Sequence, residues 1–339
     1  MIIGPAYDTA TSGTGTVFAK QVMVTQASDL SGTLDSTVAY FIDGFVDMGT
    51  TSIEVPSEGL TLLAYGFEVS KLFSTATTYT MFTSPVGGSG TLHGEGYAVE
   101  VTGVGSKVYD LVGDTGSELF EMERVRYLNC VSLGIVKGYQ QGLELGTNRI
   151  GGKPSLTLDG AWSGGYRVTT TIMRGVDNTM ADAVFKAGAT FVMQSRFLSD
   201  ANFDLGTLAP LADFIPANFP NQSTLQLNGA VIARNGVIDP TDTTILPNMT
   251  ASMLSSAFQD NIGLDNTFVG GNNEITTAVA TDLSTAGINV YADLAGTFTA
   301  ADLQHFDTPA NGQLRHIGTS PRAYKVSASI VVTVQLMTR

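Results

Sequence analysis

The amino-acid sequence predicts an all-β protein, and three observations lead to this prediction. Only 14% of the residues are charged, against roughly 25% in an average globular domain, so small polar residues and glycine must cover much of the surface. The 38 glycines among 339 residues indicate many turns. Between the turns, runs rich in β-branched and aromatic residues are each about as long as one strand. Sustained helical periodicity is hard to find, which argues against α/β folds.

Four successive segments look like turns of one repeating structure. They begin at Val38, Leu60, Gly90 and Leu119, and each holds two or three short strands and a glycine-rich close. Their spacing of roughly 20–30 residues lies in the range of solenoids, in which each coil stacks its apolar residues on the coil below. We therefore predict a right-handed parallel β-helix-like shaft. A sandwich of antiparallel strands is the alternative.

The composition changes along the chain and predicts three parts. Residues 1–30 form a polar, Thr- and Gly-rich N-terminal arm. Residues 31–267 form the shaft. A Gly- and Asn-rich joint, "FVGGNNE", then leads into residues 268–339, which read as a small antiparallel, β-sandwich-like domain.

A hairpin insertion is predicted near residues 225–238. The segment "STLQLNGAVIARNGVIDP" contains Asn228-Gly229 and Asn235-Gly236, each flanked by apolar residues. Asn-Gly between apolar runs is the strongest short-range signal for a two-residue hairpin turn.

Charge and cysteine content exclude several kinds of function. A net charge of −14 with only 17 basic residues argues against a nucleic-acid groove or binding to an anionic membrane. Cys130 is the single cysteine, which excludes an internal disulfide and predicts a buried thiol. The three histidines, His93, His305 and His316, show no metal-ligand spacing, so we expect no bound metal. No dinucleotide or nucleotide loop is present, so we expect no cofactor.

The N-terminus shows no basic segment followed by an apolar one, so no secretory signal is expected. Nor does any run approach the roughly 18 apolar residues of a membrane span.

The coils "IEVPSEGLTLLAYG" and "RYLNCVSLGIVKGYQQGLEL", the segment "AWSGGYRVTTTIM" and the β-rich C-terminal part resemble the trimeric β-helix spikes and fibres of tailed bacteriophages. This resemblance covers about residues 37–339. It implies a homotrimer on the virion surface, attached to other virion proteins through residues 1–30. It also implies a role in host contact or in decoration of the particle.

Many phage spikes of this shape are glycosidases or lyases, and a glycosidase requires two carboxylates roughly 5–9.5 Å apart. Alternate residues of one strand, about 7 Å apart, can supply that spacing. Three acidic pairs are candidates: Asp43 with Asp47, Glu121 with Glu123, and Asp110 with Asp114. A solvated strand edge is the ordinary explanation of each. Glu121 and Glu123 rank first, because Arg124 and Arg126 beside them could separate their pKa values.

Sugar binding usually needs exposed aromatic rings, and the segment "DGAWSGGYRV" contains the only tryptophan. Trp162 and Tyr166 could present a stacking face across two glycines, with Asp159 and Arg167 as polar partners. Burial in the core is the competing interpretation, because tryptophan is highly buried on average. These four residues are the predicted receptor contacts.

The predicted function is that of a structural virion protein, a phage tail fibre, tailspike or head fibre, that presents a rigid trimeric shaft for attachment to a host surface. A host surface glycan is a candidate partner. The alternatives are a tailspike polysaccharide depolymerase of the same architecture and a capsid decoration protein without receptor contact. A cellular adhesin or surface-layer protein is a more remote alternative.

Overall fold

A computed structural model describes residues 20–220, 224–249, 256–264, 270–278, 296–304, 306–310 and 313–316. The chain divides into two compact units, Met1–Phe268 and Val269–Arg339. This division lies one residue after the boundary predicted from the Gly- and Asn-rich joint.

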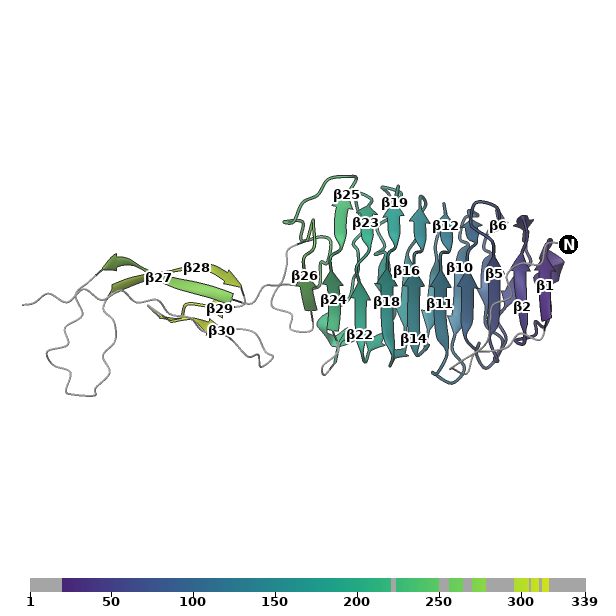
Figure 1. Ribbon diagram of the computed structural model, residues 1–339, viewed down its shortest axis with the longest axis horizontal. Helices are drawn as coiled ribbons and strands as arrows, with labels where there is room; N and C mark the ends of the chain where they lie inside the picture. Colours follow the sequence, from purple (N-terminus) through teal and green to yellow (C-terminus); the bar gives the residue numbers. More distant parts are fainter. Residues whose placement is uncertain are drawn as a thin grey trace, which may run out of the picture. The chain divides into compact units, whose positions relative to one another are not determined.

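The first unit is a stack of coils, most of which contribute one strand to each of three parallel sheets (Figure 1). Sheet A has ten strands, in the spatial order β1 (Lys20–Val24), β2 (Val38–Ile42), β5 (Leu60–Ala64), β8 (Leu92–Glu95), β11 (Leu119–Glu123), β14 (Gln141–Leu145), β18 (Gly165–Thr169), β22 (Arg196–Ser199), β24 (Thr224–Asn228) and β26 (Ser256–Gln259).

Sheets B and C complete the coils. Sheet B contains β3 (Phe45–Asp47), β6 (Lys71–Ser74), β9 (Ala98–Val101), β12 (Arg126–Leu128), β15 (Asn148–Ile150), β19 (Ile172–Arg174), β23 (Asn202–Leu205) and β25 (Val231–Arg234). Sheet C contains β4 (Ile53–Glu54), β7 (Thr80–Thr83), β10 (Lys107–Val112), β13 (Gly134–Lys137), β16 (Leu156–Asp159) and β20 (Phe185–Ala187). A short parallel pair joins β17 (Ala161–Trp162) to β21 (Val192–Met193), and two 3₁₀ helices are η1 (Ala27–Leu30) and η2 (Pro216–Asn218).

The coil length varies, as the register of sheet A shows. Ala39 pairs with Thr61 on the next coil, and Thr61 pairs with His93 on the coil after that, so the second of these coils is the longer one. The four segments recognised in the sequence begin at, or two residues before, β2, β5, β8 and β11. The prediction of an all-β protein with long parallel sheets is confirmed, and the arrangement is compatible with a parallel β-helix-like fold. An antiparallel sandwich does not fit these pairings.

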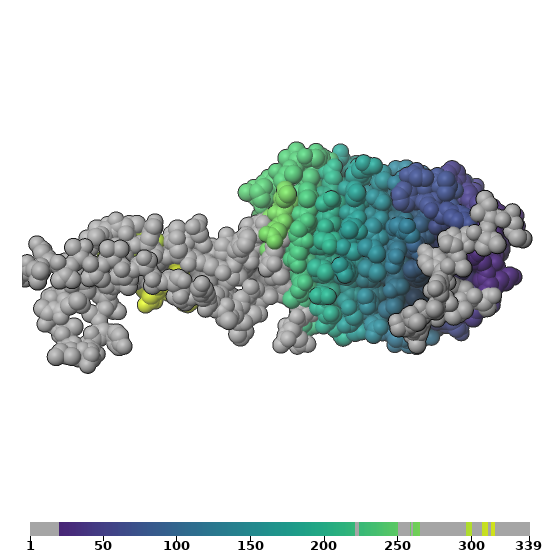
Figure 2. All heavy atoms as spheres, in the orientation of Figure 1, coloured from purple at the N-terminus to yellow at the C-terminus, as the bar shows by residue number. Residues whose placement is uncertain are grey.

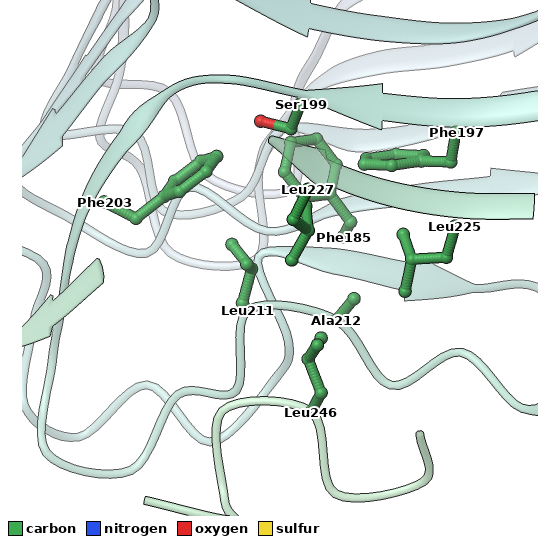
Figure 3. Close-up of a pocket in the computed structure, with 9 residues that line it drawn as sticks. All are labelled: Phe185, Phe197, Ser199, Phe203, Leu211, Ala212, Leu225, Leu227 and Leu246. Carbon is green, nitrogen blue, oxygen red and sulfur yellow. The ribbon is translucent and has the colours of Figure 1, made fainter. Parts of the chain in front are cut away.

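The interior of the stack is filled mainly with apolar side chains. Alternate strand residues point inward, so that Leu62, Met122 and Val168 occupy one continuous row and are fully buried. Nine interior residues, eight of them apolar, surround a gap that leaves no room for a water molecule (Figure 3). The interior is therefore a packed core, and the face drawn in Figure 2 shows no opening between successive coils.

A residue with positive φ makes the corner between sheets A and B. Gly96, Arg124, Gly146 and Thr170 occupy this position in four successive coils, with φ between 50° and 82°. Glycine adopts this conformation without steric cost, which explains part of the glycine content.

The predicted hairpin at Asn228-Gly229 is wrong, because β24 belongs to sheet A and β25 to sheet B. Gly229, with φ of 72°, makes the same corner as in the earlier coils. Both a hairpin turn and this corner require positive φ, so the Asn-Gly pair does not distinguish them. Asn235-Gly236, in contrast, is a two-residue reversal in which Arg234 and Val237 exchange backbone hydrogen bonds of 2.8 and 3.0 Å.

The predicted N-terminal arm is shorter than residues 1–30. Strand β1 pairs in parallel with β2 along its whole length, and Leu30 of η1 is fully buried. Residues 20–30 therefore belong to the coil stack. Residues 1–19 of the predicted arm lie outside the described residues.

The described strands of the second unit are all antiparallel. Strand β27 (Gly270–Ala278) pairs with β28 (Gly296–Gln304), and β29 (Phe306–Asp307) pairs with β30 (Arg315–His316). The Arg315 guanidinium forms a bidentate ion pair with Asp307 across the second pair.

Candidate functional site

Trp162 and Tyr166 are buried, which contradicts their predicted role as a stacking surface. Trp162 has no exposed area and Tyr166 only 1%. The Trp162 ring lies 6.3 Å from that of Tyr139 and 5.4 Å from that of Tyr166, and its Nε1 donates a hydrogen bond of 2.9 Å to the Asp159 carbonyl oxygen. Two large rings inside the stack bury more apolar surface than any exposed position would allow, so the core interpretation is correct.

Their two predicted polar partners are separated. Asp159 is only 6% exposed, and its carboxylate accepts hydrogen bonds of 2.8 and 2.9 Å from the backbone N–H and the hydroxyl of Thr190. Burial acts to raise the pKa of Asp159, but the hydrogen bonds from Thr190, the Gly160 backbone and Lys137 together outweigh it and hold the pKa below its ordinary value. Arg167 is exposed on the outer face of sheet A. These residues do not form a receptor site together.

Two of the three acidic pairs, Asp43 with Asp47 and Asp110 with Asp114, lie at exposed edges and make local contacts. Asp43 is exposed at the corner after β2, whereas Asp47 accepts a hydrogen bond of 2.9 Å from the backbone N–H of Gly49 and so closes a turn. Asp110 forms an ion pair of 2.6 Å with Lys107, and Asp114 is exposed. These contacts match the ordinary interpretation of solvated strand edges.

Glu121 and Glu123, in contrast, belong to a cluster on the outer face of sheet A. In the register of the sheet, Glu121 lies opposite His93 and Glu123 lies opposite Glu95. His93 Nδ1 is 3.5 Å from Glu121 Oε2, and its Nε2 is 3.9 Å from Glu95 Oε2. Arg124 forms an ion pair with Glu95. We call these five residues the acidic cluster.

The cluster favours the protonated form of His93. The hydrogen bond with Glu121 raises the pKa of His93, partial burial opposes this, and the charges of Glu121, Glu123 and Glu95 raise it further. The net result is a pKa above the ordinary value of 6.5. The sequence placed Glu121 beside Glu123 but could not place His93, which belongs to the preceding coil and becomes a neighbour only when the coils stack.

A group of partly or largely exposed aromatic residues lies beside this cluster, on the first coils. We call Phe41, Phe45, Tyr65, Phe67 and Phe73 the aromatic corner. Phe41 precedes Leu63 and Glu95 in one outward row of sheet A, so the corner is continuous with the acidic cluster. Tyr65 is 79% exposed and Phe45 62%. Large exposed apolar groups gathered in one place mark interaction surfaces in soluble proteins.

An additional loop contributes Tyr65 and Phe67 to the aromatic corner. Strands β5 and β6 are joined by residues 65–70, whereas the equivalent connections after β8 and β11 consist of residues 96–97 and 124–125 only. The loop is closed by backbone hydrogen bonds of 3.1 and 3.0 Å from Val69 and Ser70 to the Gly66 carbonyl oxygen. It is therefore an ordered insertion in an otherwise regular corner.

The aromatic side chains of the corner are held by their neighbours. The rings of Phe41 and Tyr65 meet edge to face at 4.4 Å. The Arg126 guanidinium lies 3.7 Å from the centre of the Phe67 ring. Such contacts restrict the rings before any ligand arrives.

Lys71 connects the two rings on the sheet B side. Its Nζ lies 5.2 Å from the Phe45 ring and 5.1 Å from the Phe73 ring. The sequence could have indicated this corner in "AYGFEV", where the apolar run continues past the end of β5 with aromatic residues on both sides of a glycine. From the sequence alone we interpret that run as one strand, and this interpretation hides the loop that carries Tyr65 and Phe67.

The described residues contain no group of three or more His, Cys, Asp or Glu side chains arranged to hold a metal ion. None of the helices in the described part of the chain has the length and apolar character needed to span a bilayer. His316 lies in β30, and His305 lies outside the described residues. Comparisons of the chain with protein-family models, curated proteins and solved structures find no match.

Proposed function

We propose that this protein is a structural attachment protein of a virus particle, a phage tail fibre, tailspike or head fibre, and that it acts as a homotrimer on the virion surface. The observation that carries the proposal is the continuous parallel stack, in which ten strands of one sheet keep register over about 43 Å at roughly 4.8 Å per strand. A filled core of this kind bends little. It serves as a spacer between a particle and a surface.

The finer features of the proposal have physical support of their own. Parallel strands joined by crossovers are almost always connected in a right-handed sense, which favours a right-handed coil. A trimer would bury additional surface of a slender stack. It would also present each contact three times, so that weak host contacts gain strength through avidity. The N-terminal residues would attach to other virion proteins, and the aromatic corner would meet the host surface.

The test is the oligomeric state and the position on the particle. Multi-angle light scattering of the full chain should give three times 35.6 kDa, and cryo-electron microscopy of the parent particle should show a three-fold projection. A monomer in both measurements would refute the proposal. If the particle shows a three-fold projection but particles that lack the protein adsorb to the host equally well, the protein is instead a capsid decoration protein.

A polysaccharide depolymerase is the second candidate, because the acidic cluster gathers three carboxylates and a histidine on one face. Glu121 and Glu123 alternate on β11 at the spacing that glycosidases use. Incubation with host polysaccharide should then release reducing ends, and the Glu121→Gln and Glu123→Gln variants should lose this release while the Asp110→Asn variant keeps it. Absence of release with the wild-type protein would exclude this candidate.

A further inference from the structure

The charges around the aromatic corner are paired with one another. Arg126 lies 2.8 Å from Glu68, and Lys71 lies 2.6 Å from Glu100. Arg124, at the border with the acidic cluster, is paired with Glu95. Each of these cations thus has a carboxylate partner within the surface itself. An anionic ligand would have to break these pairs, which costs part of any new attraction.

The surroundings oppose an anionic ligand further. Glu121 and Glu123 lie next to Glu95 in the same outer face of sheet A, and the whole chain carries a net charge of −14. Because like charges placed together cost binding free energy, these surroundings disfavour an anionic partner. A cationic partner would find the carboxylates of the corner already paired with Lys71, Arg124 and Arg126, so an uncharged partner fits best.

The exposed groups of the corner match a ligand that has an apolar ring face. Tyr65 is 79% exposed and is fixed against Phe41, and the hydroxyl of Tyr65 is a donor and acceptor at the edge of its ring. The Glu68 side chain is 72% exposed, and its carboxylate can accept hydrogen bonds beside the rings. Immobilised aromatic rings bordered by acceptors match a molecule with an apolar ring face and hydroxyl groups around its rim. Neutral sugar rings have this chemistry.

We infer that the aromatic corner is a binding site for a neutral oligosaccharide, in which Tyr65 stacks on a sugar ring and Glu68 accepts its hydroxyl hydrogen bonds. This inference rests on the proposed attachment function and names the chemical class of its ligand. Because Tyr65 already packs against Phe41 and Phe67 against Arg126, less conformational entropy is lost on binding than for rings without such contacts.

The test is calorimetric titration of the full-length protein with cellohexaose, maltohexaose and hexa-N-acetylchitohexaose as neutral probes and with hexasialic acid as the anionic probe. At least one neutral hexaose should bind. The Tyr65→Ala variant should weaken that binding about tenfold or more, as expected for a central aromatic contact, and Tyr65→Phe should keep most of it. The matched control is Val86→Ala, a fully exposed apolar residue on the turn between β7 and β8, which should leave the affinity unchanged.

The inference is overturned if none of the neutral probes binds, if hexasialic acid alone binds, or if Tyr65→Ala binds as tightly as the wild type. Light scattering of the same variants tests whether the corner instead contacts another copy of the chain. If Tyr65→Ala dissociates the trimer and no sugar binds, the corner is a subunit interface, which refutes the sugar site and leaves the attachment proposal standing. If the protein is a monomer, is absent from particles and still binds sugar through Tyr65, the sugar site is supported and the attachment proposal is refuted.

Discussion

Glu144 and Arg149 form an ion pair inside the coil stack, with 2.6 Å between Glu144 Oε1 and Arg149 Nη2 and with 1% and 0% of the two side chains exposed. The hydroxyl of Tyr166 donates a further hydrogen bond of 2.7 Å to the same carboxylate oxygen, and Arg149 Nη1 donates one of 3.0 Å to the Pro154 carbonyl oxygen. The Arg149 guanidinium also lies 4.6 Å from the Phe185 ring. These partners offset much of the loss of water around both charges, while the buried Nε of Arg149 has no hydrogen-bond partner among the described residues.

Removal of one member of this pair should destabilise the protein strongly. The Arg149→Met variant leaves the Glu144 carboxylate buried without its cation, which should lower the free energy of unfolding by about 3–5 kcal/mol. Urea denaturation followed by circular dichroism measures this change. The control is the double variant Glu144→Gln/Arg149→Met, which removes both charges and should be more stable than Arg149→Met. A double variant that is less stable than the single one would contradict a dominant role of the uncompensated charge.

Gly142 should not tolerate a side chain. It lies opposite Tyr166 in the inward row of sheet A, and an added Cβ would overlap the Tyr166 ring. The Gly142→Ala variant should therefore lose about 1–3 kcal/mol of unfolding free energy, as overpacked cores do. Gly66→Ala provides the control, because no heavy atom lies within 4 Å of the added methyl group. Equal stability of the two variants would show that the ring moves aside without cost.

His93 should stabilise the folded protein in a pH-dependent way. Its folded-state pKa is raised above 6.5, so its contribution is fully present below about pH 6.5 and is lost as the pH rises through the folded-state pKa. The groups that face it are Glu121, Glu123 and Glu95, the last of which is paired with Arg124. Titration of the His93 ring protons by NMR should give a pKa above 6.5.

The Glu121→Gln variant should lower the pKa of His93, because Glu121 makes the hydrogen bond that raises it most. The His93→Gln variant should reduce the loss of stability between pH 6 and pH 9. An NMR titration with a midpoint at or below 6.5 in the wild type would refute this assignment.

Cys130 should be unreactive in the folded protein. It is 1% exposed, and burial raises the pKa of its thiol to about 12. Because the thiolate is the reactive form, a disulfide reagent such as Ellman's reagent should label no thiol in buffer and one thiol per chain in denaturant. Rapid labelling of the native protein would show that the coils open locally around β12 and β13.

Several features of the fold could be predicted from short stretches of sequence. The short apolar runs separated by glycine indicated strands, and the segments that begin at Val38 and Leu60 are single coils of the structure. These features depend on neighbouring residues, because strand periodicity and turn chemistry are local. The acidic pair Glu121 and Glu123 was recognisable for the same reason.

The face that each residue presents was decided by stacking. In Leu143-Glu144-Leu145, alternation alone would place the leucines inside, yet Glu144 is buried and both leucines are partly exposed. Period-two alternation states which residues share a face but not which face is the interior. The rows of Met122 and Val168 on the adjacent strands set that choice for Glu144.

The sequence by itself determined the all-β fold class and the absence of an internal disulfide, since composition and local patterns are sufficient for both. Only the tertiary structure decided which residues reach the surface. It buried Trp162 and Tyr166, brought His93 to Glu121, and exposed Tyr65 on an inserted loop. The physical reason is that these contacts join residues in different coils. Their distances depend on the lengths of the turns between them, which no local pattern specifies.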